Sequence, residues 1–311
     1  MLESDSDYRL NNSREISTET NSKGTSKKLK CIIILSLITT FIIITGVIVL
    51  LIFYLSNEEE SEHSSDTLIG EINCIYDIKN ISKETPLLGD KFEQLSSLEI
   101  YINNKKINST TKYKFEKEGE NEVKFEIYED LNMDYMYQNI LDLKSVTIVS
   151  TKNAKITSMK STFENCQNIK SFFISRFNTS NIKSMSKLFY GTNISISDIE
   201  GLDTNNVKDM SFMFASTKVK ELDFKNLNTN QVKNMSYMFY GSMIEQLDLS
   251  KFQTDNVLDM SHMFESCKNL KKVDLQYFKT NNVKNMNSMF ANSSIREINL
   301  TKLNTSKVTD M

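Results

Sequence analysis

The chain contains no tryptophan, one proline, eight glycines and two histidines in 311 residues. This scarcity runs through all regions alike, so we attribute it to the composition of the genome. The two histidines, His63 and His262, lie far apart in the sequence and form neither a metal cluster nor part of a catalytic triad. A nucleophile elbow, a phosphate-binding loop and a pair of catalytic carboxylates are also missing. We therefore predict a non-enzymatic protein with no metal and no cofactor.

An excess of positive charge is also lacking, since the formal net charge is −3. No basic stripe with interleaved aromatic residues occurs outside a short lysine cluster, so we expect no nucleic-acid partner. Four cysteines are present, and Cys31 lies at the edge of an apolar run. The remaining three, Cys74, Cys166 and Cys267, are an odd number, which predicts a spare thiol.

One long uncharged run is present, from Cys31 to Leu55. At about 1.5 Å per residue it spans roughly 37 Å, which is enough to cross the roughly 30 Å hydrocarbon core of a bilayer. The alternative is a cleaved signal peptide, which needs an apolar core of only about 7–15 residues and a small-residue cleavage site. The run is too long for that alternative and lacks an obvious site. We predict a single-pass signal anchor that uses the lipid bilayer as a partner.

The charged flanks of this run predict its orientation. Four lysines precede it and four glutamates follow it: Lys23, Lys27, Lys28, Lys30, Glu58, Glu59, Glu60 and Glu62. Because positive flanks remain cytoplasmic, we expect a cytoplasmic N-terminus and extracellular repeats at the cell membrane. Cys31, beside the lysines, is either palmitoylated or an unmodified cysteine of the apolar helix.

Composition divides the chain into five predicted regions: a disordered cytoplasmic tail (1–30), a transmembrane helix (31–55), an acidic stalk (56–69), a small β-rich module (70–145) and a repeat solenoid (146–311). In the module, the strand signals of Ser97–Ile102 and Lys105–Asn108 flank Asn103 and Asn104. Asparagine tolerates the positive φ of a tight turn, so we predict a hairpin. The module is expected to be a spacer or an N-terminal cap for the solenoid.

The strongest signal is an internal repeat. A methionine in the pattern V-x-x-M-x-x-M-F recurs at steps of 25 or 26 residues: Met159, Met185, Met210, Met235, Met260, Met286 and Met311. We call these the anchor methionines. The chain ends within the last repeat, at the point where S-x-M-F is expected to follow. Since solenoids need a terminal cap, we expect a truncated gene product or a fragment.

Each repeat is predicted to contain a short helical segment and a short strand. Val207, Met210, Met213 and Phe214 fall on one stripe of a helix, whereas on a strand Val207 and Met210 point to opposite faces. Leu222 and Phe224 alternate as an inward-facing strand does. One such coil cannot bury its apolar side alone, so the coils are expected to stack with parallel strands. The predicted fold class is an α/β solenoid.

Two polar columns accompany the repeat at its turn. One is threonine (Thr179, Thr204, Thr229, Thr254, Thr280 and Thr305) and the other is asparagine (Asn181, Asn206, Asn256 and Asn282). We expect these side chains to satisfy the turn backbone from coil to coil. The methionines are interpreted as core filler, because thioethers pack well into irregular gaps.

The segments NTNQVKNMSYMFYGSMIEQLDLSKF and NVLDMSHMFESCKNLKKVDLQYF resemble the BspA-like leucine-rich repeats of bacterial, mycoplasma and protist surface proteins. The resemblance covers about residues 151–311. It implies a leucine-rich-repeat-like fold, exposure at the cell surface and a role in adhesion, and it brings no catalytic residues. We therefore predict a surface protein for adhesion or for recognition of an extracellular protein or glycan. The alternatives are a structural coat, a variable antigen, or a receptor fragment that recruits partners through its tail.

Several candidate sites follow from the repeat. The residues between the inward strand positions form an outward column: Asp198, Asp223, Asp248, Asp274 and Asn299. This column is either a face for a cationic ligand or a solvated face balanced by Lys220, Lys225, Lys271 and Lys272. Of the eight glycosylation sequons that follow the apolar run, those at Asn80 and Asn108 are the expected acceptors. Cys166 and Cys267 lie four coils apart, too far for a disulfide. We expect Cys166 and Cys267 to be buried thiols. The alternative is a disulfide between Cys74 and Cys166.

Overall fold

The computed structural model describes residues 67–311 apart from 151–153, 195–198, 201, 223 and 225–226, all within one compact unit, Asp66–Met311. The predicted tail, the transmembrane helix and nearly all of the stalk lie outside the described residues. Among the residues that are described, no helix is long and apolar enough to cross a membrane.

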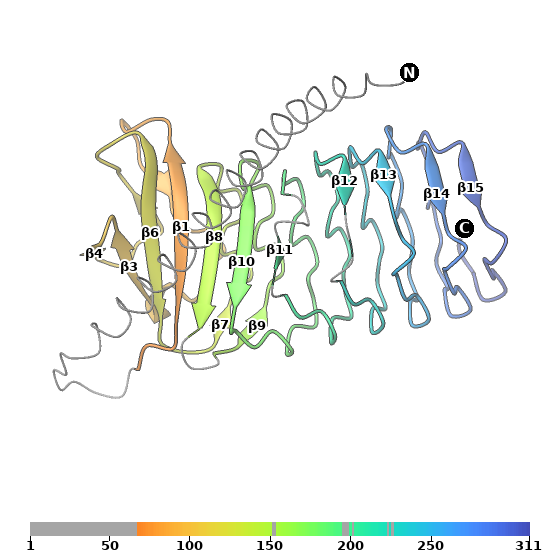
Figure 1. Ribbon diagram of the computed structural model, residues 1–311, viewed down its shortest axis with the longest axis horizontal. Helices are drawn as coiled ribbons and strands as arrows, with labels where there is room; N and C mark the ends of the chain where they lie inside the picture. Colours follow the sequence, from red (N-terminus) through yellow and green to blue (C-terminus); the bar gives the residue numbers. More distant parts are fainter. Residues whose placement is uncertain (1–66, 151–153, 195–198, 201, 223, 225–226) are drawn as a thin grey trace, which may run out of the picture. The chain divides into compact units, whose positions relative to one another are not determined.

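Short strands dominate the secondary structure (Figure 1). In chain order they are β1 (Gly70–Ile78), β2 (Thr85–Pro86), β3 (Leu98–Ile102), β4 (Lys105–Ile107), β5 (Lys112–Tyr113), β6 (Gly119–Ile127), β7 (Leu131–Asn132), β8 (Leu143–Ser150), β9 (Ile156–Ser158), β10 (Ser171–Ser175), β11 (Ile199–Glu200), β12 (Glu221–Leu222), β13 (Gln246–Leu247), β14 (Lys272–Asp274) and β15 (Glu297–Asn299). A single 3-10 turn, η1 (Leu95–Ser97), is the one helical element in the described part of the chain.

The N-terminal module is an antiparallel sheet that continues directly into the repeats. Its strand order is β11-β10-β8-β1-β6-β3-β4. Strand β8 pairs antiparallel with β1 on one side and parallel with β10 on the other. The predicted hairpin is confirmed, because β3 and β4 pair around Asn103 and Asn104, whose φ angles are 47° and 66°. Module and repeats therefore share one sheet.

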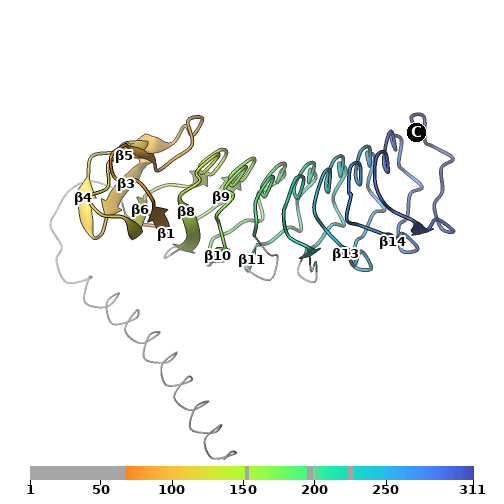
Figure 2. The same cartoon turned by 90° about the horizontal axis from the view of Figure 1, so that it is seen from above.

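From β8 onward the coils lie one beside another, with strands along one side of the row and turn segments along the other (Figure 2). The coils are parallel, as expected. Examples are the pairs β10–β11, β12–β13 and β14–β15. On the turn side, the residue before each anchor methionine forms an isolated parallel bridge with the next coil, from Ser184 through to Asp310. The repeats thus form a β-solenoid.

The predicted helical segment of each coil is wrong, and a run of tight turns replaces it. Met213 N donates to Met210 O at 3.2 Å, as in a β-turn. The backbone amides of Met210, Phe212 and Phe214 donate instead to backbone carbonyls of the next coil, at 2.9–3.0 Å. Phe212 and Ser216 have φ angles of 57° and 55°, in the left-handed region. A helix allows neither the left-handed residues nor amides that point out of the coil.

The apolar residues nevertheless face the core as predicted. Those at and around the anchor methionine are buried in successive coils, including Val207, Met210, Met213 and Phe214. The left-handed residues recur four positions apart, so the turn run has a period of four. The inward residues are the anchor methionine itself and the residues three and four positions after it. This spacing fits a period of four as well as it fits a helix of 3.6 residues per turn. The spacing of apolar residues therefore does not distinguish the two structures.

The polar columns act between coils as expected. The Thr204 hydroxyl donates to Asn228 O at 3.0 Å and accepts from Asn228 N at 2.8 Å. The same pair of bonds joins Thr229 to Gln253. In the second column, Asn206 Nδ2 donates to a carbonyl of the preceding coil at 2.8 Å. These bonds join turn backbone groups of one coil to side chains of its neighbour.

Candidate functional site

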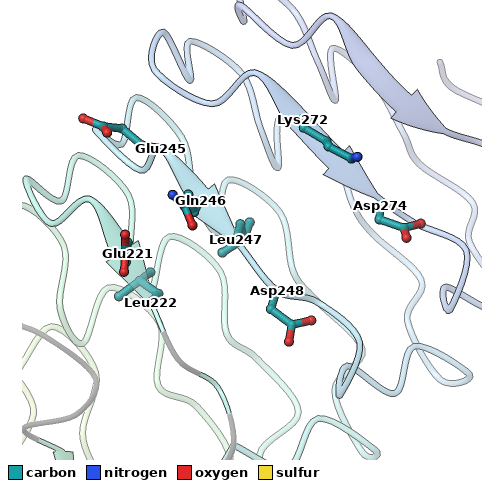
Figure 3. A pocket seen from close by; sticks show the side chains of 8 residues that line it. All are labelled: Glu221, Leu222, Glu245, Gln246, Leu247, Asp248, Lys272 and Asp274. Carbon is teal, nitrogen blue, oxygen red and sulfur yellow. The ribbon is translucent and has the colours of Figure 1, made fainter.

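The sheet face of the solenoid carries a shallow groove of about 560 Å³. Side chains from β12, β13 and β14 line it, as Figure 3 shows: Glu221, Leu222, Glu245, Gln246, Leu247, Asp248, Lys272 and Asp274. Four of these carry a carboxylate and one carries an ammonium group. At the rim, Lys220 Nζ lies 2.9 Å from Glu245 Oε1, and this hydrogen bond raises the pKa of the lysine. The groove is therefore predominantly acidic.

The groove lies where the ladder between neighbouring strands is interrupted. The ladders pair β12 with β13 and β14 with β15, but none joins β13 to β14 in the described part of the sheet. The coil from Met260 to Met286 is one residue longer than its predecessor. Its extra residue in the approach to β14 corresponds to Asn269, whose side chain donates to Met243 O of the preceding coil at 3.3 Å. The interruption of the ladder thus lies beside a one-residue insertion.

The predicted acidic column is only partly placed. Asp198 and Asp223 lie outside the described residues. Asp248 and Asp274 line the groove, and Asn299 follows at the same position in the next coil, outside the lining.

Each described member of the column caps the turn after its strand. Asp248 Oδ1 accepts from Ser250 N at 2.9 Å, and Asp274 Oδ1 accepts from Gln276 N at 3.0 Å. Asn299 Oδ1 accepts from Thr301 N in the same way. This role explains why Asn can replace Asp at this position, since both side chains form such turns.

The balancing lysines contact other carboxylates. Lys220 pairs with Glu245, and Lys272 Nζ lies 3.6 Å from Glu297 Oε2. Lys271 Nζ instead donates to Lys268 O, and Lys225 lies outside the described residues. Glu221 and Glu245, which sequence reasoning missed, supply half of the carboxylates in the groove. Their signal was a glutamate one or two residues before the first inward leucine of the strand.

Residues 131–246 and again residues 218–311 match the family described as "Mycoplasma protein of unknown function, DUF285". The two matches together cover more than half of the chain. The chain belongs to this family. The match agrees in a general way with the resemblance to BspA-like repeats. No curated protein and no solved structure matches the chain.

The DUF285 match begins at Leu131, one coil before the first anchor methionine recognised in the sequence. Met133, Met136 and Tyr137 repeat the M-x-x-M-F pattern with tyrosine in place of phenylalanine, and all three are buried. Tyr135 and Asn139 have the same left-handed φ angles, 59° and 64°, as their counterparts in later coils. The stacked turns of the DUF285 repeat therefore begin at β7.

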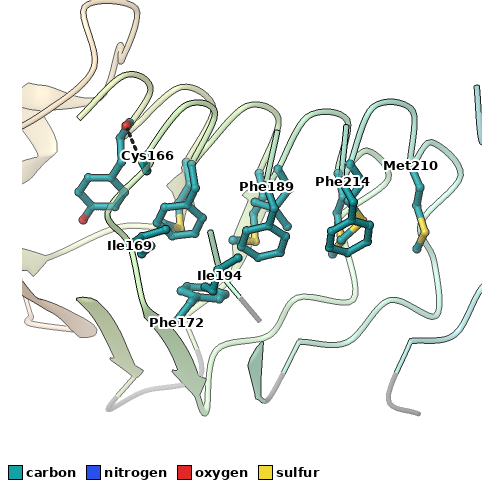
Figure 4. Packing of buried hydrophobic residues seen from close by; sticks show 14 of the residues in the cluster. Cys166, Ile169, Phe172, Phe189, Ile194, Met210 and Phe214 are labelled. Carbon is teal, nitrogen blue, oxygen red and sulfur yellow. Dashed lines mark hydrogen bonds between the residues drawn. The ribbon is translucent and has the colours of Figure 1, made fainter. Parts of the chain in front are cut away.

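Cys166 and Cys267 are buried free thiols, as expected, and the alternative pairing of Cys166 with Cys74 is not found, because Cys74 is also free and buried. Each thiol has a polar partner instead. Cys74 Sγ lies 3.3 Å from the Tyr137 hydroxyl, and Cys166 Sγ donates to Tyr137 O at 2.8 Å (Figure 4). Burial raises the pKa of the Cys74 thiol to about 12 and raises that of Cys166 strongly. These thiols are poor nucleophiles at neutral pH.

Two further predicted sites of this DUF285 protein fall on exposed loops. Asn80 and Asn108 are both exposed, and Asn108 follows directly after β4. Cys31, the predicted palmitoylation site, lies outside the described residues. Within the described ranges, no group of three His, Cys, Asp or Glu side chains is arranged to hold a metal ion.

Proposed function

We propose that this protein is a non-enzymatic recognition module displayed at the cell surface, and that its sheet-face groove binds a basic segment of an extracellular partner protein. The acidic groove supports the proposal most directly. Its four carboxylates come from three successive coils, and only Lys272 among the lining residues opposes them. Solenoids commonly bind partners along a continuous face that several repeats build together.

A variant in which the groove is neutralised tests this assignment. We choose Glu221→Gln, Glu245→Gln, Asp248→Asn and Asp274→Asn. The two Asp→Asn changes preserve the turns, because Asn299 already forms the same hydrogen bond one coil further on. The control neutralises four exposed acids of the N-terminal module: Glu84, Asp90, Glu116 and Glu118.

The full-length protein is first screened against cells, matrix proteins and glycans, and the variants are then measured on each protein that binds. We expect the groove variant to bind roughly tenfold or more weakly, and the control to bind normally. Equal binding by the groove variant and the natural protein would remove the groove as the site. A screen without any bound protein would instead favour a structural coat.

Display at the surface is a separate part of the proposal. It is supported by the uncharged run of residues 31–55 and by its lysine-rich and glutamate-rich flanks. Epitope tags at the two chain ends, probed with antibodies on intact and on permeabilised cells, test it. The C-terminal tag should be stained on intact cells and the N-terminal tag only after permeabilisation. The reverse pattern contradicts the proposed orientation.

A further inference from the structure

A row of lysines runs across the coils on the turn side, away from the acidic groove. The residue two positions before the anchor methionine is Lys183, Lys208, Lys233, Leu258 and Lys284 in five successive coils. Their backbones bond directly to one another. Lys208 N donates to Lys183 O and Lys233 N to Lys208 O, both at 2.8 Å, and the ladder continues through Leu258 to Lys284. Coils bonded in this way are about 5 Å apart, which sets the spacing of the row.

The lysine row is open to solvent and electrostatically unbalanced. All four lysines are exposed, and in the described part of the chain none of them has a carboxylate within ion-pair distance. The nearest acids in sequence, Asp209 and Asp259, cap the turn inside their own coils. Their Oδ1 atoms accept from Ser211 N at 3.0 Å and from Ser261 N at 2.8 Å. Adjacent like charges about 5 Å apart repel one another, and a bound anion relieves that repulsion.

We propose that the lysine row binds a linear sulfated polysaccharide. The charges of the row recur from coil to coil with one gap, at Leu258, which matches a polymer with several anionic groups along its length rather than a single compact anion. Lysine is a point charge on a flexible stem, so it adapts to sulfate groups without the fixed planar geometry that arginine imposes. This binding surface is separate from the acidic groove and does not depend on it.

The neighbouring surface argues against two other polyanions. Single-stranded nucleic acid binds basic grooves by stacking its bases on open aromatic faces. Four residues further along the coils, the rings of Phe212, Tyr237 and His262 stack on one another at 4.3 Å and 4.2 Å, which covers the faces between them. An acidic peptide that binds by strand addition needs free backbone groups to pair with. The amides and carbonyls of the lysine row are already bonded between coils.

The test uses the full-length protein and dextran sulfate, with unsulfated dextran for comparison. The main variant replaces Lys183, Lys208, Lys233 and Lys284 with glutamine. A second variant replaces the same four with arginine, which keeps the charge. The matched control replaces four other exposed lysines with glutamine: Lys114, Lys117, Lys251 and Lys302.

We expect dextran sulfate to bind and unsulfated dextran not to bind. The glutamine variant should bind roughly tenfold or more weakly and with a smaller dependence on salt, because fewer counterions are released. The arginine variant and the control should bind like the natural protein, and thermal melting checks that each variant is folded.

Three results overturn the proposal. The first is no binding of dextran sulfate near physiological salt. The second is equal loss of binding in the control and in the glutamine variant. The third is tighter binding of a single-stranded oligonucleotide or a polyglutamate peptide to the same four lysines, which would assign the row to another class of partner.

Discussion

The most regular contact in the core is made by the aromatic rings four residues after Met133 and after the anchor methionines from Met159 to Met286. These rings stack across the coils: Tyr137, Phe163, Phe189, Phe214, Phe239, Phe264 and Phe290. Figure 4 shows Phe189 and Phe214 in this column. Their centroids are 5.6–6.2 Å apart and neighbouring planes lie within 16° of each other. Each ring therefore joins the cores of two neighbouring coils.

Removal of one buried ring should be costly. We expect Phe214→Ala to lower the free energy of unfolding by about 3–5 kcal/mol, because it leaves a cavity between two stacked rings. The control is Phe212→Ala, which removes a partly exposed ring two residues away in the same turn. Urea denaturation of both variants measures the difference. Equal losses would show that the buried column does not dominate the packing.

The buried thiol of Cys74 predicts a specific dependence of stability on pH. Its pKa is about 12 in the folded protein, raised by burial from an ordinary value of 9.0. Below pH 9 both states keep the proton, so the stability is unaffected. Between pH 9 and about 12 the unfolded state releases a proton that the folded state retains, and stability falls as pH rises.

Urea unfolding at pH 7, 8, 9 and 10 for the natural protein and for Cys74→Ala isolates this effect from other titrating groups. The stability of the natural protein should fall more steeply above pH 9 than that of the variant. Parallel curves would mean that Cys74 ionises normally in the folded state. In the folded protein at pH 8, alkylating reagents should also leave Cys74 and Cys166 unmodified.

At the scale of the element, the turn segment depends on two left-handed residues in each coil. The second of these positions is glycine in two coils, with φ angles of 67° at Gly191 and 60° at Gly241. A methyl group at Gly191 meets Asn165 Oδ1 at 2.6 Å, whereas at Gly241 the nearest atom is 3.7 Å away. Asn165 in turn donates to Asn139 of the preceding coil. The two glycines thus share a conformation and differ in available space.

Replacing each of these two glycines with alanine separates the cost of backbone strain from the cost of a steric clash with a neighbouring side chain. We expect Gly241→Ala to cost about 1–2 kcal/mol, the penalty for a left-handed residue with a Cβ atom. Gly191→Ala should cost about 1 kcal/mol more, because it also displaces the hydrogen-bonded Asn165 side chain. Thermal or urea denaturation measures both. If Gly191→Ala costs no more than Gly241→Ala, displacement of the Asn165 side chain does not contribute to the loss of stability.

The elements show which parts of the fold are readable from sequence. The inward strand residues Leu222 and Val273 and the threonine column were predicted correctly, because period-two alternation and a 25-residue repeat both survive in the sequence. The turn segment was misread as a helix, since apolar spacings of three and four residues fit both structures. The left-handed residues and the amides donated to the next coil separate the two structures, and side chains such as those of Phe212 and Tyr237 give no sign of a positive φ.

The candidate sites were predicted less completely. Asp248 and Asp274 line the groove, which lies at the break between β13 and β14. Whether two neighbouring strands pair is set by three-dimensional packing, which the repeat pattern does not reveal. The lysine row was overlooked for a different reason. Its members are at least 25 residues apart in the sequence, and only stacking brings them together.

At the scale of the whole molecule, the N-terminal module covers the first coil of the solenoid. Tyr137 of that coil packs between Phe163 of the next coil and Phe125 of β6, with centroids 5.6 Å and 6.3 Å away. Its hydroxyl also contacts Cys74 of β1. Together with the pairing of β8 to both β1 and β10, these contacts favour a cap over a spacer.

Shared strand pairing predicts that module and first coils unfold together. Ile148 is fully buried in β8, at the junction, so Ile148→Asp places an uncompensated carboxylate in the common core. Hydrogen exchange should show loss of protection in β1, β6 and β10 in a single step. The comparison is Val283→Asp, an equally buried change in the coil that leads to Met286. Because coils contact only their neighbours, this change should expose β14 and β15 and leave the module protected.

Independent folding of the module predicts a different outcome for the same experiment. In that case Ile148→Asp leaves β1 and β6 protected while β10 exchanges, and the cap is then a separate domain that merely adjoins the repeats. The antiparallel ladder from β1 to β8 argues against this, since it joins seven consecutive residues of β1, from Gly70 to Tyr76, to β8. Strand β8 is bonded to β1 on one side and to β10 on the other, so its unfolding leaves backbone groups of both neighbours without partners, and cooperative loss is the expected result.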